Sequence, residues 1–239
     1  MTVRPRAVVA GANGAIGTAV TTRLARAGWE VIATYRRAPG PAAYVTWIRF
    51  DGTSTAGSEL LRAEFAQDPR PVGAVICCVG APSTKRHVAE TDPAEFDDVF
   101  AANVTAVARL WQAVSGPARA GAAGVVVLGS STTTALRPGN GAYSAAKAGA
   151  EALVATLAAE EAVHGVRVNM VAPSLVDSPL AASILELKGV ADPGAYYTSL
   201  PWGRALDADE VACAAVDLAT APQWRYASGQ VVRLAVRGA

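Results

Sequence analysis

Tyr143 and Lys147 are the two side chains whose types and spacing most clearly suggest chemistry. They stand four residues apart in a stretch that reads as a helix, so both would lie on one helical face about one turn apart. A lysine ammonium near a phenol favours the phenolate and should lower the phenol's pKa from about 10. Such a group could exchange a proton near neutral pH. Because this spacing also arises by chance in solvated helices, the pair needs a cofactor and a site around it.

Strand-like and helix-like patterns alternate along the chain, and these elements must position the pair. The expected strands cover residues 7–10, 31–34, 44–50, 72–79, 125–128, 166–171 and 230–234. The expected helices cover residues 15–27, 58–66, a long region after 93, 142–164 and 207–220. Several strands are apolar on both faces, which is typical of a parallel sheet covered on both sides. We therefore predict an α/β fold, a doubly wound parallel (Rossmann) sheet of about seven strands in the order 3-2-1-4-5-6-7, with helices on both faces.

No repeat, linker or boundary interrupts residues 1–239, so we expect a single dinucleotide-binding domain. The poorly patterned stretch 179–201 is too long for a plain connection and is predicted to be a substrate lid. Its apolar and aromatic side chains suggest a hydrophobic substrate, but packing on the core or on a second subunit explains them equally well. These side chains are Leu180, Ile184, Leu185, Leu187, Tyr196, Tyr197, Leu200 and Trp202. The basic stretch 83–87 could contact an anionic or carrier-bound substrate, although we favour a solvated loop there.

The charge balance of the chain argues against a polyanionic partner. With 21 basic and 20 acidic residues the net charge is +1, so neither nucleic acid nor an anionic membrane surface is expected to bind. Charged residues make up 17% of the chain and hydrophobic residues 51%. A globular chain with so little charge often buries surface in an assembly, so we expect a homo-oligomer, a tetramer or a dimer. A bias towards alanine would explain the same figures without a partner.

Three cysteines, two of them adjacent at Cys77 and Cys78, do not suggest a disulfide framework. No Cys-x-x-Cys or histidine cluster has metal-ligand spacing, so no metal site is expected. The N-terminus runs directly into a strand-like segment without a secretory signal. No apolar stretch reaches the roughly 20 residues that a membrane span requires. We therefore expect a cytoplasmic protein.

A glycine-rich turn follows the first expected strand and opens the first expected helix. In the Rossmann arrangement such glycines permit a tight turn and close approach of the backbone to a pyrophosphate. The N–H groups at the helix N-terminus then face the phosphates. We assign to the cofactor the residues Gly11, Asn13, Gly14, Ala15, Ile16 and Gly17.

The second expected strand ends in Tyr35, Arg36 and Arg37. An acidic residue usually occupies this place when the ribose 2′-hydroxyl is bound. Guanidinium groups suit a 2′-phosphate instead, so we favour NADP(H) over NAD(H). The alternative is that both arginines only solvate a loop.

With these motifs in order, the chain resembles the short-chain dehydrogenase/reductase family over nearly its full length. The resemblance implies four catalytic residues: Ser130, Tyr143, Lys147 and Asn103. Ser131, one residue later, is the alternative to Ser130 as the catalytic serine. Tyr143 and Lys147 would also contact the cofactor. The further cofactor contacts that it implies are Asp51, Gly52, Cys78, Gly80, Pro173, Val176 and Ser178.

The chain departs from the family pattern at four places. The spacing Gly-x-x-Gly-x-x-Gly is closer to the longer or atypical branches, whereas length and downstream motifs favour the single-domain branch. Residues 77–80 read Cys-Cys-Val-Gly where the family has Asn-Asn-Ala-Gly, which removes asparagine side-chain bonds and keeps a backbone contact. Pro-Ser at 173–174 replaces Pro-Gly. Ala-Val-Arg at 235–237 replaces an acidic-Gly-Gly segment to which the family owes subunit contacts.

The resemblance implies hydride transfer between the nicotinamide and a carbonyl or alcohol. Tyr143 would donate the proton, Lys147 would lower its pKa and bond the nicotinamide ribose, and Ser130 would hold the substrate oxygen. Asn103 would support a water relay, although it could instead bond backbone within its own helix. The competing hypothesis is a non-catalytic regulator that senses NADP. A sensor has no need of the serine, tyrosine and lysine together.

Overall fold

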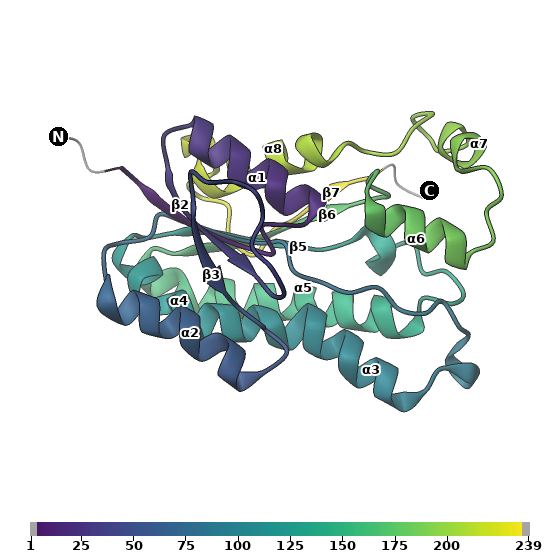
Figure 1. The fold of residues 1–239 in the computed structure, drawn as a ribbon, viewed down its shortest axis with the longest axis horizontal. Helices are drawn as coiled ribbons and strands as arrows, with labels where there is room; N and C mark the ends of the chain where they lie inside the picture. Colours follow the sequence, from purple (N-terminus) through teal and green to yellow (C-terminus); the bar gives the residue numbers. More distant parts are fainter. Residues whose placement is uncertain (1–3, 236–239) are drawn as a thin grey trace.

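A parallel sheet forms the centre of the molecule (Figure 1). The computed structural model describes residues 4–235 of the 239-residue chain. The strands are β1 (Arg6–Ala10), β2 (Glu30–Tyr35), β3 (Thr46–Arg49), β4 (Ala74–Cys77), β5 (Gly124–Leu128), β6 (Arg167–Pro173) and β7 (Val231–Leu234). They pair in the order β3-β2-β1-β4-β5-β6-β7, and every pairing is parallel. This order and the fold class confirm the sequence-based prediction.

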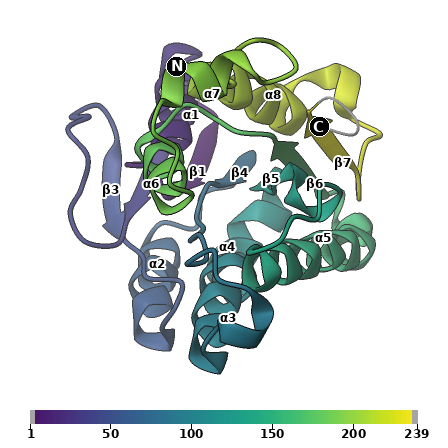
Figure 2. The ribbon, with the colours of Figure 1, turned by 90° about the vertical axis from the view of Figure 1, so that its right-hand side faces the viewer.

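Helices connect the strands on both sides of the sheet (Figures 1 and 2). The α-helices are α1 (Ala15–Arg26), α2 (Thr55–Gln67), α3 (Pro93–Phe100), α4 (Ala106–Ala120), α5 (Gly141–Glu161), α6 (Pro179–Leu187), α7 (Pro193–Thr198) and α8 (Ala208–Thr220). A π-helical turn, η2 (Ala101–Thr105), lies between α3 and α4. Short 3-10 turns are η1 (Val88–Glu90), η3 (Ser131–Thr133), η4 (Ala162–His164) and η5 (Pro222–Trp224).

Two apolar cores lie on the two faces of the sheet. All five residues of β1 are buried, and their side chains alternate between the faces, as the period of two in a strand requires. Val8 belongs to the core under α2, α4 and α5, whereas Val9 belongs to the core under α1 and α8. Burial on both faces explains why these strands read as continuous apolar runs.

The carboxyl ends of the central strands meet at one edge of the sheet. In the parallel register Ala10 pairs with Cys77, Cys77 with Val127, and Leu128 with Val171. The segments that follow these strands therefore emerge side by side. In an open parallel sheet this edge, where the connections diverge to opposite faces, is the usual place for a ligand.

Two predicted elements differ from the observed ones. The stretch 179–201 forms two helices, because Ser178 and Asp192 cap their N-termini and a proline follows each cap. The long helix expected after residue 93 is interrupted by the π-turn η2. The departure noted at 235–237 falls largely on residues beyond 235, outside the described part of the chain.

Candidate active site

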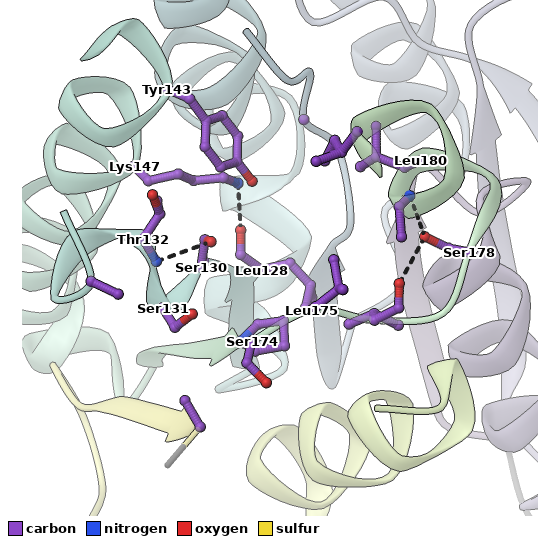
Figure 3. Close-up of a pocket in the computed structure, with 18 of the residues that line it drawn as sticks. Leu128, Ser130, Ser131, Thr132, Tyr143, Lys147, Ser174, Leu175, Ser178 and Leu180 are labelled. Atoms are coloured by element: carbon purple, nitrogen blue, oxygen red, sulfur yellow. Dashed lines mark hydrogen bonds between the residues drawn. The ribbon is translucent and has the colours of Figure 1, made fainter. Parts of the chain in front are cut away.

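Tyr143 and Lys147 lie on one face of α5, next to the end of β5 (Figure 3). Lys147 is 4% exposed, and its Nζ donates a hydrogen bond to the carbonyl oxygen of Leu128 at 2.9 Å. The same Nζ lies 5.7 Å from the centroid of the Tyr143 ring. The helical spacing thus brings the two side chains together as predicted.

Burial sets the protonation of both groups. It lowers the pKa of Lys147 to about 8, against the weaker opposing effect of the thiols of Cys77 and Cys78. Burial raises the pKa of Tyr143, and the hydroxyl of Ser130 acts in the opposite direction. The expected lowering of the tyrosine pKa by Lys147 is therefore wrong. Desolvation of the phenolate is the larger effect here, and the ammonium is hydrogen-bonded to Leu128.

Ser130 follows β5 by two residues and caps the N-terminus of the 3-10 turn η3. Its Oγ accepts a hydrogen bond from the backbone N–H of Thr132 at 3.3 Å. Ser130 lines the cleft together with Tyr143, and its hydroxyl lowers the pKa of that phenol. Ser131 lines the same cleft, but only the hydroxyl of Ser130 acts on the pKa of Tyr143, which favours Ser130 as the residue that would meet a substrate oxygen.

Asn103 sits in the π-turn η2 and is 1% exposed. Its Nδ2 donates to the carbonyl oxygen of Val99, one turn back in the helix, at 2.8 Å, as the alternative interpretation expected. It also donates to the carbonyl oxygen of Ala81, in the segment after β4, at 2.9 Å. Its Oδ1 is buried and has no hydrogen-bond partner among the described residues. A Cβ placed on Gly80 would lie 2.8 Å from this Oδ1 and 3.4 Å from Nζ of Lys147. An unpaired buried oxygen beside the lysine fits a site that a polar ligand or water completes.

The turn between β1 and α1 is packed closely at Gly11 and Gly17, where a side chain would meet backbone atoms. Gly11 has a φ of +72°, in the left-handed region, and its carbonyl accepts from the N–H of Gly14 at 3.1 Å. A Cβ on Gly17 would lie 2.1 Å from the oxygen of Gly11. No side chain caps the N-terminus of α1, and its first turn carries no acidic residue. The free N–H groups and the bare turn fit a pyrophosphate.

The segment after β2 reaches over the glycine turn. Nδ2 of Asn13 donates to the carbonyl of Ala38 at 3.0 Å, so the two loops are joined. Arg36 and Arg37 are exposed. Hydrogen bonds from Thr53 lower the pKa of Asp51, and the charge of Arg36 adds to this effect. Arg36 and Asp51, both predicted to contact the cofactor, are thus near each other.

A largely apolar cleft opens at the carboxyl edge of the sheet. Of the predicted site residues, it is lined by Ile16, Cys78, Gly80, Ser130, Tyr143, Lys147, Pro173, Val176 and Ser178. The lining does not include Gly11, Asn13, Gly14, Ala15, Gly17, Tyr35, Arg36, Arg37, Asp51, Gly52 or Asn103. This second group lies around the glycine turn, the end of β2 and η2. Figure 3 shows Ser178 across the cleft from Tyr143 and Lys147.

Helices α6 and α7 and the segment after them form the outer wall of the cleft. Of the expected lid residues, the cleft is lined by Leu180, Ile184, Tyr196, Leu200 and Trp202. Leu185 is buried in the protein, Leu187 is exposed, and the hydroxyl of Tyr197 donates to Asp177. Sequence reasoning missed the polar lining residues Arg137, Asn140 and Lys188. For Asn140 a signal was available, because an asparagine before a long helix is typical of an N-cap.

The described residues include no group of three or more His, Cys, Asp or Glu side chains that could hold a metal ion. None of the described helices has the length and hydropathy needed to cross a membrane.

A Rossmann sheet with a glycine turn and a tyrosine–lysine pair at its carboxyl edge defines the class of dinucleotide-binding oxidoreductases. The family described as enoyl-(acyl carrier protein) reductase matches residues 10–234. The chain belongs to the short-chain dehydrogenase/reductase family of oxidoreductases, whose members use nicotinamide cofactors.

Similar proteins agree with this assignment. The chain is 28% identical over 235 residues to the 3-oxoacyl-(acyl-carrier-protein) reductase FabG of Vibrio harveyi, covering 95% of this chain and 94% of that one. It is 32% identical over 188 residues to the short-chain dehydrogenase RED2 of Pyricularia oryzae, covering 71% and 66%. The solved aldohexose dehydrogenase of Thermoplasma acidophilum shares the fold at 21% identity, with a TM-score of 0.86 and coverage of 97% and 92%.

Proposed function

We propose that this protein is an NADP(H)-dependent reductase of a hydrophobic ketone, acting in reverse as an alcohol dehydrogenase. The observation that carries the proposal is the joint position of Tyr143 and Lys147 in an apolar cleft at the sheet edge where the glycine turn opens. The names of two relatives support it. FabG of Vibrio harveyi is a 3-oxoacyl-(acyl-carrier-protein) reductase, and a relative in Synechocystis, 28% identical over 229 residues, is an acetoacetyl-CoA reductase.

Tyr143, Ser130 and Lys147 each have a separate role in the proposed reduction. A bound nicotinamide supplies the hydride. Tyr143, with its raised pKa, is protonated at neutral pH, which is the form that donates a proton to a carbonyl oxygen during reduction. Ser130 holds that oxygen and stabilises the charge that develops on it. Lys147, with a pKa of about 8, carries a positive charge at neutral pH and stabilises the phenolate left behind.

Two features support NADP(H) over NAD(H). Arg36 and Arg37 follow β2 at the place where an acidic residue usually selects the unphosphorylated ribose. Guanidinium groups bind phosphate by paired, charge-assisted hydrogen bonds. Exposure of both arginines leaves them free to meet a 2′-phosphate.

The cleft wall supports a hydrophobic substrate. Leu180 and Ile184 of α6, with Tyr196 of α7, line the side opposite the catalytic pair. Leu200 and Trp202 extend this apolar wall. Such a lining favours a ketone with an alkyl or aromatic body. The competing sensor hypothesis does not explain why Ser130, Tyr143 and Lys147 converge in the cleft.

A direct test measures NADPH oxidation with a panel of alkyl and aryl ketones, using the wild-type protein and Tyr143→Phe. We expect the variant to keep its affinity for NADPH and to lose kcat by roughly 10²–10⁴-fold, because it lacks the proton donor. Tyr226→Phe, which changes an exposed phenol outside the cleft, is the matched control. Unchanged turnover by Tyr143→Phe would contradict the assignment of the acid.

A further inference from the structure

The chain contains only three lysines among its 21 basic residues, and all three line the same cleft. They are Lys85, Lys147 and Lys188; every other basic residue is an arginine. Lysine differs from arginine in presenting a compact point charge on a flexible stem. Lys147 belongs to the catalytic pair, so two lysines in the cleft have no role in the proposed reaction.

Lys85 is held in place over the catalytic tyrosine. It lies between β4 and α3 with a φ of +68°, a left-handed backbone conformation that is uncommon for a residue with a side chain. Its backbone packs against Gly139, where an added Cβ would lie 2.5 Å from the carbonyl oxygen of Lys85. Its Nζ donates to Oδ1 of Asn140 and lies 5.4 Å from the centroid of the Tyr143 ring. A strained backbone that fixes a side chain is typical of a functional site.

Lys188 lies at the end of α6, on the opposite wall of the cleft. Its Nζ lies 5.6 Å from the centroid of the Tyr196 ring, another residue of that wall. Burial lowers the pKa of Lys85, and the charge of Lys188, which lines the same cleft, lowers it further. Like charges that face each other across a partly desolvated cleft favour an anion between them.

The described residues of the cleft offer these lysines no counter-charge. No aspartate or glutamate lines it, and neither Lys85 nor Lys188 forms a salt bridge within the described chain. Arg204, by contrast, lines the cleft but is paired with Glu210 at 2.7 Å. Arg137 and Lys147 line the same cleft, and neither forms a salt bridge within the described chain. A positive cleft without acidic residues raises the local concentration of anionic ligands.

We propose that Lys85 and Lys188 form an anion subsite beside Tyr143, so that the substrate is a ketone carrying a carboxylate or phosphoryl group at the end away from its apolar body. This inference rests on the proposed reductase function and narrows its substrate class. For the basic stretch 83–87 it takes up the alternative of an anionic substrate, because Lys85 lines the cleft.

The test compares three aryl ketones of equal body: 4-acetylbenzoate, its methyl ester and 4-acetylphenyl phosphate. Steady-state reduction is measured with wild-type protein, Lys85→Gln, Lys188→Gln and Arg225→Gln. Arg225 is the matched control, a cation 4.9 Å from the centroid of a tyrosine ring outside the cleft. We expect a KM for at least one anionic ketone roughly tenfold below that of the ester, and each lysine substitution should raise that KM about tenfold more than the KM of the ester. Comparison of the two anions identifies the preferred group.

Equal KM values for the anions and the ester, or equal losses on both in the lysine variants, would overturn the subsite. Calorimetric titration of the same compounds into the protein with NADP⁺ keeps the two proposals separable. If no ketone is reduced but 4-acetylbenzoate or the phosphate binds more tightly than the ester, and does so through Lys85 and Lys188, the reductase function fails and the subsite stands. If the ester is reduced and the anions gain no affinity, the function stands and the subsite fails.

Discussion

Lys147 is an ammonium group with one hydrogen bond to the protein and almost no contact with water. Its folded pKa of about 8 lies below the ordinary value of 10.5, because burial disfavours the charged form. The folded state therefore binds fewer protons than the unfolded state between these two values. It follows that the stability of the ligand-free protein must rise with pH through this window.

Lys147→Met should remove this dependence. Below pH 8 the folded wild-type protein carries the cost of a buried charge, so the variant should be the more stable protein by on the order of 3 kcal/mol. The difference should shrink as pH rises from 8 towards 10.5. Urea denaturation of both proteins between pH 7 and 10 measures it. A difference that stays constant over this range would show that the lysine titrates normally.

Glu161 is a second buried charge, but unlike Lys147 it has an oppositely charged partner. It is 2% exposed at the end of α5, where Arg119 donates to both of its oxygens at 2.7 and 2.8 Å and the indole of Trp111 donates to one at 3.0 Å. These bonds, with the Arg119 pair foremost, hold the pKa of Glu161 below its ordinary value. The paired carboxylate joins α4 to α5 and thereby supports the helix that carries the catalytic residues.

Glu161→Gln should destabilise the protein by roughly 2–3 kcal/mol at pH 7, because it leaves Arg119 without its charge partner. The stabilisation by the carboxylate is complete above its unfolded pKa of about 4.5 and is lost as pH falls through the lower folded value. The gap between wild type and variant should therefore close in acid. Glu160→Gln, an exposed neighbour, should cost less than about 0.5 kcal/mol at any pH. Equal effects of the two substitutions would contradict the role of the network.

At the scale of elements, the turn between β1 and α1 is tight because the first turn of α1 packs directly against the backbone of residues 11 and 12. Gly17 in α1 lies against the backbone of Gly11, and an added Cβ would lie 2.1 Å from an oxygen and 2.9 Å from the α-carbon of Ala12. Gly14, at the start of the same helix, has ordinary space, because a Cβ there would lie 3.5 Å from the oxygen of Gly11. One turn thus contains one glycine required by packing and one that is not.

Gly17→Ala should shift α1 away from β1 and cost roughly 1–3 kcal/mol, with loss of cofactor affinity. Gly14→Ala should change the free energy of unfolding by less than about 1 kcal/mol, since its backbone is in an ordinary region and its Cβ meets nothing closely. Chemical denaturation of both variants provides the comparison. A Gly14→Ala variant less stable than Gly17→Ala would contradict the packing argument.

Some helices and strands could be predicted from the sequence alone, and others could not. The strands of the central sheet were predictable because burial on both faces makes them continuous apolar runs, as in β1 and β5. The π-turn at Ala101–Thr105 was not predictable, because it continues the dihedral angles of the flanking helices, and Asn103 stabilises it through contacts with Ala81 that are distant in sequence. The lid helices were missed although Ser178 and Asp192 are recognisable caps. The raised pKa of Tyr143 depends on burial, which only the packed cleft determines.

At the scale of the whole molecule, the proposed cofactor site draws residues from the ends of β1, β2, β3, β4 and β6 and from α5. A ligand that joins so many elements binds only the folded state and must therefore stabilise all of it. Adenosine phosphate recognition by Arg36 would add to this stabilisation for NADP⁺ but not for NAD⁺. Cofactor preference can thus be measured as heat resistance, without a substrate.

A saturating ligand at about 100 times its Kd adds roughly 2.7 kcal/mol of stability. For a chain of this size we expect NADP⁺ at that level to raise Tm by roughly 5–10 °C, and NAD⁺ at equal concentration to raise it less. Arg36→Ala should reduce the shift with NADP⁺ and leave the shift with NAD⁺ unchanged. Arg62→Ala, an exposed arginine on α2, is the control. Equal shifts for both cofactors in the wild-type protein would contradict the proposed preference.

The homo-oligomeric state and the cytoplasmic location stay predictions. Several large apolar side chains are exposed on the described surface, including Val88, Leu136 and Val163. Scattered apolar residues are common on monomers, so they do not identify an interface. Sedimentation of the purified protein measures the subunit number directly.

The restriction of lysine to a single cleft has a practical consequence. Reagents that acylate primary amines have, apart from the chain's own terminus, only three places to react, and all of them open on the same depression. Counting the acylated lysines by intact-protein mass spectrometry would therefore report whether a ligand occupies the cleft. The composition of the chain thus supplies a local chemical label, and no engineered tag is needed.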